Sequence, residues 1–231
     1  MSWQLTHGVE DFRRTAGPYL DADPAGCTVL LTVAETVRRH GPRPYADEDD
    51  DARFGWWRRT AGGPVEAAFV QTPPKAPLLG PMPDEAAREL AEALRGTYVA
   101  GVKGADGPAQ AFAAAWTGSG GAWTAVRRTR LFRLGDLTPP CPAPPGTARR
   151  ATAADVPLAA GQSRVSPVYT PPELRGRGYA GAVTAAVSRA AQDAGARQVL
   201  LFADAANPTS TALYQRLGYR PAAEHLDIGF A

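Results

Sequence analysis

Residues 165–219 of the chain read VSPVYTPPELRGRGYAGAVTAAVSRAAQDAGARQVLLFADAANPTSTALYQRLGY. The apolar residues of this stretch predict a strand over 165–170 and, after a loop, a helix over 180–193. Between them, residues 175–178 consist only of arginine and glycine. A strand joined to a helix through a glycine-containing turn is a unit from which α/β folds are built.

The second part of the stretch continues this alternation. Residues 198–203, QVLLFA, form a short apolar run that is typical of a buried strand. Residues 209–217 predict a helix that ends at Gly218, and residues 228–230 predict a short final strand. These elements predict an α/β fold of the α+β kind, with a mixed sheet.

The loop between the first strand and the first helix suits an anion of phosphate type. Gly176 and Gly178 have no side chains, so successive backbone N–H groups can turn toward one ligand. The helix that begins near Tyr179 adds the positive end of its dipole. Arg175 and Arg177 supply positive charge at the rim. The alternative is a plain strand-to-helix turn whose arginines are solvated.

The same glycines also imitate a dinucleotide-binding fingerprint. Gly176, Gly178 and Gly181 spell G-x-G-x-x-G, and Asp204 ends the next predicted strand. In that fingerprint the first glycine directly follows the strand. Here residues 171–175 intervene, and two prolines among them hold the chain extended. We therefore reject a dinucleotide-binding site of this kind.

The loop has a second, more specific similarity. Its sequence Arg175-Gly176-Arg177-Gly178-Tyr179-Ala180 fits the R-x-x-G-x-A pyrophosphate loop of the GNAT acetyltransferase superfamily. Asn207, Tyr214 and the Gly218-Tyr219 pair follow in the order N-x6-Y-x3-G-Y. Residues 165–219 thus resemble a GNAT domain, and the resemblance implies the GNAT fold for the C-terminal part and acetyl-CoA as co-substrate.

The resemblance also implies a role for individual residues. The strand around Val168, Tyr169 and Thr170 would offer backbone hydrogen bonds to the pantetheine arm. The backbone amides of Arg175, Gly176, Arg177, Gly178, Tyr179 and Ala180 would hold the pyrophosphate, and Asn207 would contact the cofactor arm. Tyr214 would stand near the sulfur and protonate the departing thiolate. Taken by itself, Tyr214 fits ordinary packing beside Leu213 and Leu217, and Tyr169 and Tyr219 are expected to be packing residues.

The chemistry of acyl transfer makes a tyrosine acid reasonable. A phenol with a pKa of about 10 stays protonated at pH 7 and can reprotonate a thiolate whose thiol has a pKa of about 8.5. An amine acceptor with a pKa of about 10.4 is mostly charged at pH 7, so a base or a water chain is also needed. No activated nucleophile is visible in the sequence, which favours direct transfer in a ternary complex.

A proline-rich stretch divides the chain. Residues 138–147, TPPCPAPPGT, carry five prolines in ten positions and predict an extended linker. Residues 1–137 then form a first domain and residues 148–231 a second. In the first domain we expect helices over 8–21, 24–40, 83–94 and 109–116, and strands over 54–57, 64–71, 77–79, 98–102 and 123–134. This order resembles a degenerate GNAT-like domain without the loop, so that the chain would be a tandem.

The second domain is short for the family that it resembles. A GNAT domain places two helices and two strands ahead of the cofactor strand, whereas few residues separate Leu158 from Arg164. Either a segment is absent near residues 158–161, which is the explanation that we favour, or the first half of the chain completes the sheet.

Composition excludes several other classes of protein. The 231 residues are 44% apolar and 21% charged, which is typical of a globular protein, and no run is long enough to span a membrane. A net charge of +2 gives no support to a nucleic-acid surface, and two cysteines and three unclustered histidines give none to a metal site. The start of the chain lacks a signal peptide, so we expect a cytoplasmic protein. Heavy use of Arg, Ala, Gly and Pro suggests a bacterial genome rich in G and C.

We therefore expect a cytoplasmic bacterial N-acetyltransferase of GNAT type that takes acetyl-CoA and an amine, with no metal. The alternative is a non-catalytic acyl-CoA-binding or interaction module. The sequence leaves open the amine acceptor, the general base and whether the chain forms a homodimer.

Overall fold

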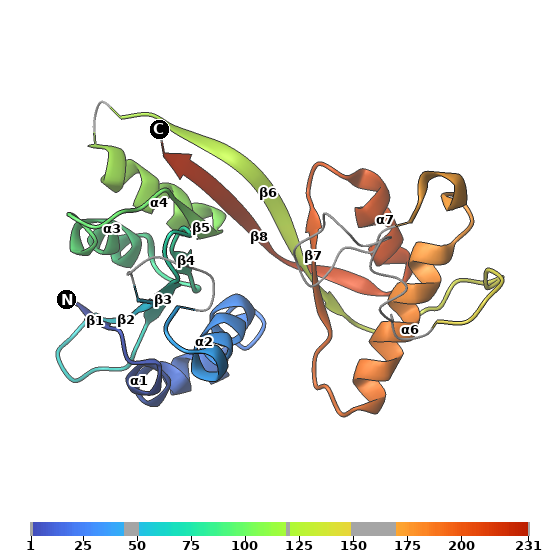
Figure 1. The fold of residues 1–231 in the computed structure, drawn as a ribbon, viewed down its shortest axis with the longest axis horizontal. Coiled ribbons are helices and arrows are strands. Elements are labelled where there is room, and N and C mark those ends of the chain that lie inside the picture. The colour runs from blue at the N-terminus through green and yellow to red at the C-terminus, as the bar shows by residue number, and fades with distance from the viewer. Residues whose placement is uncertain (1, 44–50, 119–120, 149–169, 231) are drawn as a thin grey trace. The chain divides into compact units, whose positions relative to one another are not determined.

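The computed structural model describes residues 2–43, 51–118, 121–148 and 170–230. Its strands are β1 (Ser2–Thr6), β2 (Arg53–Arg58), β3 (Ala67–Gln71), β4 (Leu78–Leu79), β5 (Gly101–Ala105), β6 (Trp123–Leu134), β7 (Leu200–Asp204) and β8 (Tyr219–Phe230). The strand order is β1-β2-β3-β4-β5-β8-β6-β7 (Figure 1). Because β4 and β5 run parallel while β5 and β8 run antiparallel, the sheet is mixed, which confirms the predicted α+β class.

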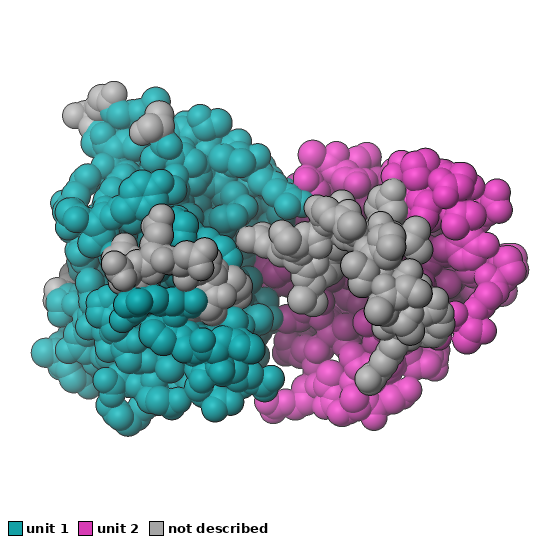
Figure 2. Space-filling view, viewed as in Figure 1, with its two compact units in different colours: residues 1–130, 223–231 teal, residues 131–222 magenta. Residues whose placement is uncertain are grey.

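The chain divides into two compact units (Figure 2). Unit 1 comprises Met1–Arg130 and Ala223–Ala231, and unit 2 comprises Leu131–Ala222. Both cuts fall inside long strands, β6 and β8, rather than at the proline-rich residues 138–147, which lie within unit 2 without helix or strand. The expected division into a first domain, a linker and a second domain stays a prediction.

Unit 1 places helices on both faces of its part of the sheet. These helices are α1 (Val9–Ala22), α2 (Thr28–His40), α3 (Asp84–Ala93) and α4 (Asp106–Thr117). Neighbouring strand residues alternate between the two faces: Phe69 packs with the buried residues of α3 and α4, while Ala68 and Val70 pack with those of α1 and α2. This continuous burial makes β3 an entirely buried strand.

Several predicted boundaries in this half are wrong. The strand β1 was not predicted, and α2 begins at Thr28 rather than at Pro24. Residues 24–27 form a turn instead, in which the Asp23 carboxylate accepts a hydrogen bond from the Gly26 amide at 3.0 Å. The fifth strand lies at Gly101–Ala105, three residues beyond the predicted start.

The C-terminal strand is much longer than predicted. It begins at Tyr219 rather than at residue 228, and its last part pairs with β5, from Ala105 opposite His225 to Gly101 opposite Gly229. C-terminal residues thus pair with the sheet of the first half, while the two explanations for the short C-terminal part stay predictions. Residues 158–161, where we favoured an absent segment, lie outside the described residues.

Unit 2 contains α6 (Tyr179–Asp193), α7 (Pro208–Arg216) and β7, together with the adjoining parts of β6 and β8. Its core consists of buried Phe132, Ala185, Ala203, Leu217 and Tyr219. The predicted helix 180–193 and strand 198–203 are thus present with shifts of one or two residues. No helix of the described ranges is both long and apolar enough to cross a membrane.

The turn that ends α7 depends on a glycine. Gly218 has φ +99°, and a Cβ there would lie 1.9 Å from the backbone oxygen of Asp136. The Gly218 carbonyl also accepts a hydrogen bond from the Gly135 amide at 3.0 Å. The end of α7 is therefore pressed directly against the backbone that follows β6.

We expect Gly218→Ala to destabilise the protein by about 3 kcal/mol or more, because the new methyl group would overlap a backbone oxygen and φ would be strained. Gly195→Ala is the matched control: Gly195 follows α6 with φ +85°, but a Cβ there meets nothing within 4 Å. Gly195→Ala should lower the free energy of unfolding by about 1–2 kcal/mol. Urea unfolding measures both, and equal losses would contradict the close approach at Gly218.

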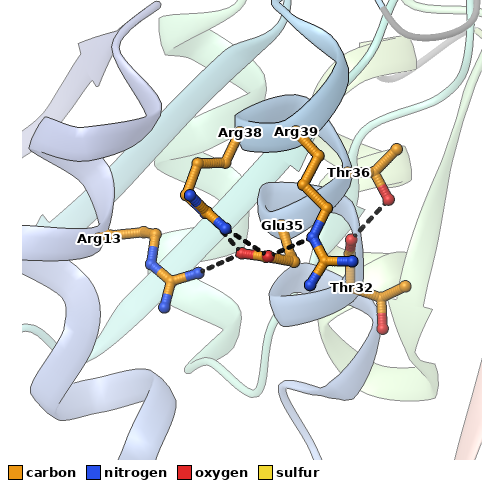
Figure 3. Close-up of polar contacts among 6 residues, drawn as sticks. All are labelled: Arg13, Thr32, Glu35, Thr36, Arg38 and Arg39. Carbon is orange, nitrogen blue, oxygen red and sulfur yellow. Dashed lines mark hydrogen bonds and ion pairs between the residues drawn. The ribbon is translucent and has the colours of Figure 1, made fainter.

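The exposed face of α2 carries a group of arginines around one carboxylate (Figure 3). Arg38 donates two hydrogen bonds to Glu35, at 2.8 and 2.7 Å, and Arg39 donates one at 2.6 Å. Arg13 of α1 adds another at 3.1 Å and so joins the two helices. Hydrogen bonds from Arg38 and then Arg39 lower the pKa of Glu35 from its usual 4.5 to about 2.

We expect Glu35→Gln to lower the melting temperature at pH 7, because the neutral amide cannot hold three guanidinium groups. The folded pKa lies below the unfolded one, so the stabilising contribution is complete above about pH 4.5 and disappears as the pH falls toward 2. The difference between variant and parent should shrink over that range. Glu92→Gln is the control, because it removes an α3 carboxylate that forms an ion pair with the single arginine Arg95. A difference that is constant with pH would contradict this account.

Candidate functional site

The predicted anion loop is an exposed turn that leads into α6. A short 3-10 turn, Pro172–Leu174, precedes it, and residues 175–178 are all exposed. Gly176 has φ +75° and Gly178 has φ +82°, a backbone conformation that side chains disfavour. Gly178 is the N-cap of α6. Both glycines are therefore needed for the path of the backbone.

The start of α6 has the electrostatics of an anion site. No side chain caps it, and its first turn contains no acidic residue. The first N–H groups of a helix have no partner within the helix, so those of Tyr179 and Ala180 are available to a ligand or to water. The N-terminus of α3 in unit 1 differs, because Asp84 and Glu85 occupy its first turn and would repel an anion.

The two loop arginines have different environments. The Arg175 side chain donates a hydrogen bond from Nε to the Thr170 carbonyl oxygen at 3.0 Å, which ties the loop to the residue before the prolines. Arg177 is exposed, and no hydrogen bond or ion pair joins it to another residue within the described ranges. Arg175 thus shapes the loop, while Arg177 is the charge that an incoming anion would meet.

Of the three residues predicted to contact the pantetheine arm, only Thr170 is described. It is half-buried, and its carbonyl already accepts from Arg175. Val168 and Tyr169 lie outside the described residues, so their predicted role stays a prediction.

Asn207 is the N-cap of α7. Its side-chain oxygen accepts a hydrogen bond from the Ser210 amide at 3.0 Å, and Pro208 occupies the first helical position. The sequence Asn-Pro-x-Ser signals this cap, which our sequence analysis missed. With the oxygen used in this way, the Asn207 amide nitrogen is the atom that could donate to a ligand.

Tyr214 is half-buried on α7. Its ring centroid lies 6.3 Å from that of Phe132 and 6.1 Å from that of Tyr219, which meets it edge-on. Burial, and then the neighbouring Tyr219, raise the pKa of Tyr214 above its usual 10, so its hydroxyl keeps its proton at neutral pH. Tyr219 itself is buried, as its expected packing role requires.

A third glycine explains how α6 and α7 come together. Gly181 is buried, and a Cβ there would lie 3.3 Å from Leu213 Cδ1. The first turn of α6, which follows the loop, therefore packs closely on α7 beside Tyr214. The glycine that imitated a dinucleotide fingerprint is thus a packing residue. Among the described residues no group of three or more His, Cys, Asp or Glu side chains could hold a metal ion.

Comparison with known proteins supports the GNAT resemblance for the second half of the chain. Residues 148–226 match the family of FR47-like proteins, which is related to the GNAT superfamily. This match covers about a third of the chain. No curated protein sequence is significantly similar.

Two solved structures are similar to the whole chain. A Drosophila protein, solved by X-ray crystallography at a structural genomics consortium, has a TM-score of 0.68 at 15% identity, covering 99% of this chain and 98% of that one. This likeness shows that the fold recurs in another protein from end to end. An acetyltransferase of the GNAT family from Colwellia psychrerythraea has a TM-score of 0.46 at 9% identity, covering 100% and 99%, and a similarity this low says nothing about function.

If the start of α6 is an anion site, inorganic pyrophosphate should raise the melting temperature, and Arg177→Ala should weaken its binding by about tenfold, because a charge-assisted hydrogen bond is lost. Arg216→Ala is the control: it removes the same charge from the exposed last turn of α7. Titration by calorimetry at fixed ionic strength compares them. Equal weakening by both substitutions would point to a general charge effect and against the loop.

Proposed function

We propose that the chain is an N-acetyltransferase that transfers the acetyl group of acetyl-CoA directly to a primary amine. The FR47-like match and the α+β fold suggest an acyltransferase. The observation that carries the finer proposal is the loop from Arg175 to Ala180. Two glycines in the left-handed region, a helix start that no side chain caps and that has no acidic residue in its first turn, and an exposed arginine meet there.

The residues of the loop fit the diphosphate of coenzyme A. The N–H groups at the start of α6 would bind it, and Arg177 would add a charged contact at the rim. The Asn207 amide nitrogen would donate to the arm, and the backbone of Val168, Tyr169 and Thr170 would pair with the pantetheine amides. The start of α3 in unit 1 is not expected to bind in this way, because Asp84 and Glu85 occupy its first turn. Unit 1 would then be the degenerate copy of a tandem.

Tyr214 is proposed as the acid. Bound acetyl-CoA would supply the activated acetyl group, and the sulfur needs a proton when its bond to the acetyl carbon breaks. The raised pKa of Tyr214 keeps that proton on the phenol at neutral pH, ready to be donated. The residue lies on α7, whose packing partner at Gly181 belongs to the first turn of α6.

A second candidate function is favoured by the packing of Tyr214. The ring lies against Phe132 and Tyr219 in the apolar core of unit 2, as a structural aromatic residue would. With Tyr214 in that role, the chain would bind acyl-CoA through the loop without catalysing transfer. Tyr214 therefore discriminates between the two functions.

The test combines a thermal-shift titration with an assay of thiol release against a panel of amines. Acetyl-CoA at 100 times its dissociation constant should stabilise the protein by about 2.7 kcal/mol. Amine-dependent thiol release should then fall about a hundredfold or more in Tyr214→Phe, while acetyl-CoA affinity is unchanged, because only the proton donor is lost. Tyr98→Phe, a change at an exposed residue of unit 1, is the control.

Three outcomes separate the candidates. A thermal shift with thiol release that depends on Tyr214 supports the acetyltransferase. A shift without turnover with any amine supports the binding module. The absence of a shift contradicts both, because the loop would then not bind the cofactor.

A further inference from the structure

A hydrogen-bonded chain connects the start of α6 with the end of α7. On the buried face of α6, the Thr184 hydroxyl donates to the Ala180 carbonyl at 2.9 Å, and the Ser188 hydroxyl donates to the Thr184 carbonyl at 2.6 Å. Ser188 Oγ also lies 2.7 Å from the hydroxyl of Tyr219. Tyr219 follows Gly218 directly, where α7 ends and β8 begins.

Counting protons fixes the direction of the last hydrogen bond. A serine hydroxyl carries one proton and a carbonyl oxygen can only accept. Since Ser188 gives its proton to the Thr184 carbonyl, the Tyr219 hydroxyl must donate to Ser188. Tyr219 is only 2% exposed, so this hydrogen bond has no competition from bulk water. Its ring is consequently held by its hydroxyl at one end and by the backbone of Gly218 at the other.

The fixed ring of Tyr219 is one of the two aromatic neighbours of Tyr214. The ring centroids lie 6.1 Å apart in an edge-on arrangement, and Phe132 lies 6.3 Å away. The side chain of Tyr214 therefore depends on where Tyr219 stands, and Tyr219 depends on Ser188. In this way α6, which follows the anion loop, is connected through Ser188 and Tyr219 to Tyr214, the proposed proton donor.

We propose that Tyr219 is a positioning residue for Tyr214: its hydrogen bond to Ser188 braces the start of β8 against α6, and the Tyr219 ring so fixed keeps the Tyr214 hydroxyl at a fixed place relative to the loop. As a determinant of catalytic rate, the brace rests on the proposed acetyl transfer. The effect of this hydrogen bond on where the Tyr214 ring lies depends only on the packing of unit 2. Tyr219 itself transfers no proton to the substrate.

The test removes the brace from either end. Tyr219→Phe keeps the ring and loses only the hydroxyl, and Ser188→Ala loses the acceptor. Each should lower kcat about tenfold with saturating acetyl-CoA and leave acetyl-CoA affinity unchanged, because the loop is intact while the acid is displaced. The double variant should be no worse than either single variant, since all three lack the same hydrogen bond.

Thr184→Val is the matched control. It removes a neighbouring hydroxyl from the same buried face of α6, without contact to Tyr219 in the hydrogen-bonded chain. It should lower the melting temperature to a similar degree and leave kcat unchanged, with assays made well below melting. A fall in kcat in Thr184→Val equal to that in Tyr219→Phe would show that only stability matters and would overturn the proposal.

A second readout does not depend on turnover. The ring carbon that bears the hydroxyl of Tyr214 can be followed by NMR in protein with 13C-labelled tyrosine, assigned through Tyr214→Phe. In Ser188→Ala, which keeps the Tyr219 hydroxyl that also raises this pKa, the titration midpoint of Tyr214 should move down toward 10, because the loosened ring admits water.

The two readouts separate failure of the brace from failure of the proposed function. If the parent protein shows no thiol release but the midpoint moves in Ser188→Ala, the brace stands and acetyl transfer fails. If thiol release occurs, kcat is unchanged in both variants and the midpoint is unchanged in Ser188→Ala, the positioning role is overturned while acetyl transfer stands. If neither thiol release nor a change of midpoint occurs, both are overturned.

Discussion

The N–H groups at the start of α6, which no side chain of the described residues caps, are the constraint on which the proposed site in unit 2 depends. A helix can begin this way in an exposed turn only if its amides meet water or a ligand. Gly176 and Gly178 bring the backbone into the helix through the left-handed region, without side chains in front of those amides. No carboxylate occupies the first turn, so the positive end of the helix dipole is left uncompensated. An anion with several oxygens is the ligand that such an arrangement favours.

The remainder of unit 2 holds the start of α6 in place against α7. Gly181 lets α7 approach the first turn of α6, and Gly218 lets the end of α7 approach the backbone after β6. Between these two contacts, Ser188 and Tyr219 form the buried hydrogen bond that connects α6 with the first residue of β8. Unit 1 supplies an internal comparison: α3 also follows a strand of the sheet, but Asp84 and Glu85 compensate its dipole. The starts of α3 and α6 thus differ in the charge that an anion would meet.

The sequence predicts the parts of this fold that local signals determine. The alternating residues 123–134 correspond to β6 with both boundaries, and the helices α3, α6 and α7 begin and end within one or two residues of their predicted bounds. The strand β1 was missed because only two of its five side chains are even partly buried, and pairing with β2 makes it a strand. The length of β8 was missed because Pro221 and the alanines after it disguise a strand that depends on distant partners. The loop was found because glycine, arginine and a following helix are adjacent in sequence, whereas the hydrogen bond between Ser188 and Tyr219 joins residues 31 positions apart.

The most direct test of this account is a map of backbone amide shifts in 15N-labelled protein during titration with acetyl-CoA. The account predicts that the largest changes fall on Gly176, Gly178, Tyr179 and Ala180, whose N–H groups would meet the diphosphate. The amides of the first turn of α3, at Asp84–Ala87, should stay where they are. Changes centred on α3, or spread over the surface without a maximum at the loop, would contradict the claim that the start of α6 binds the cofactor.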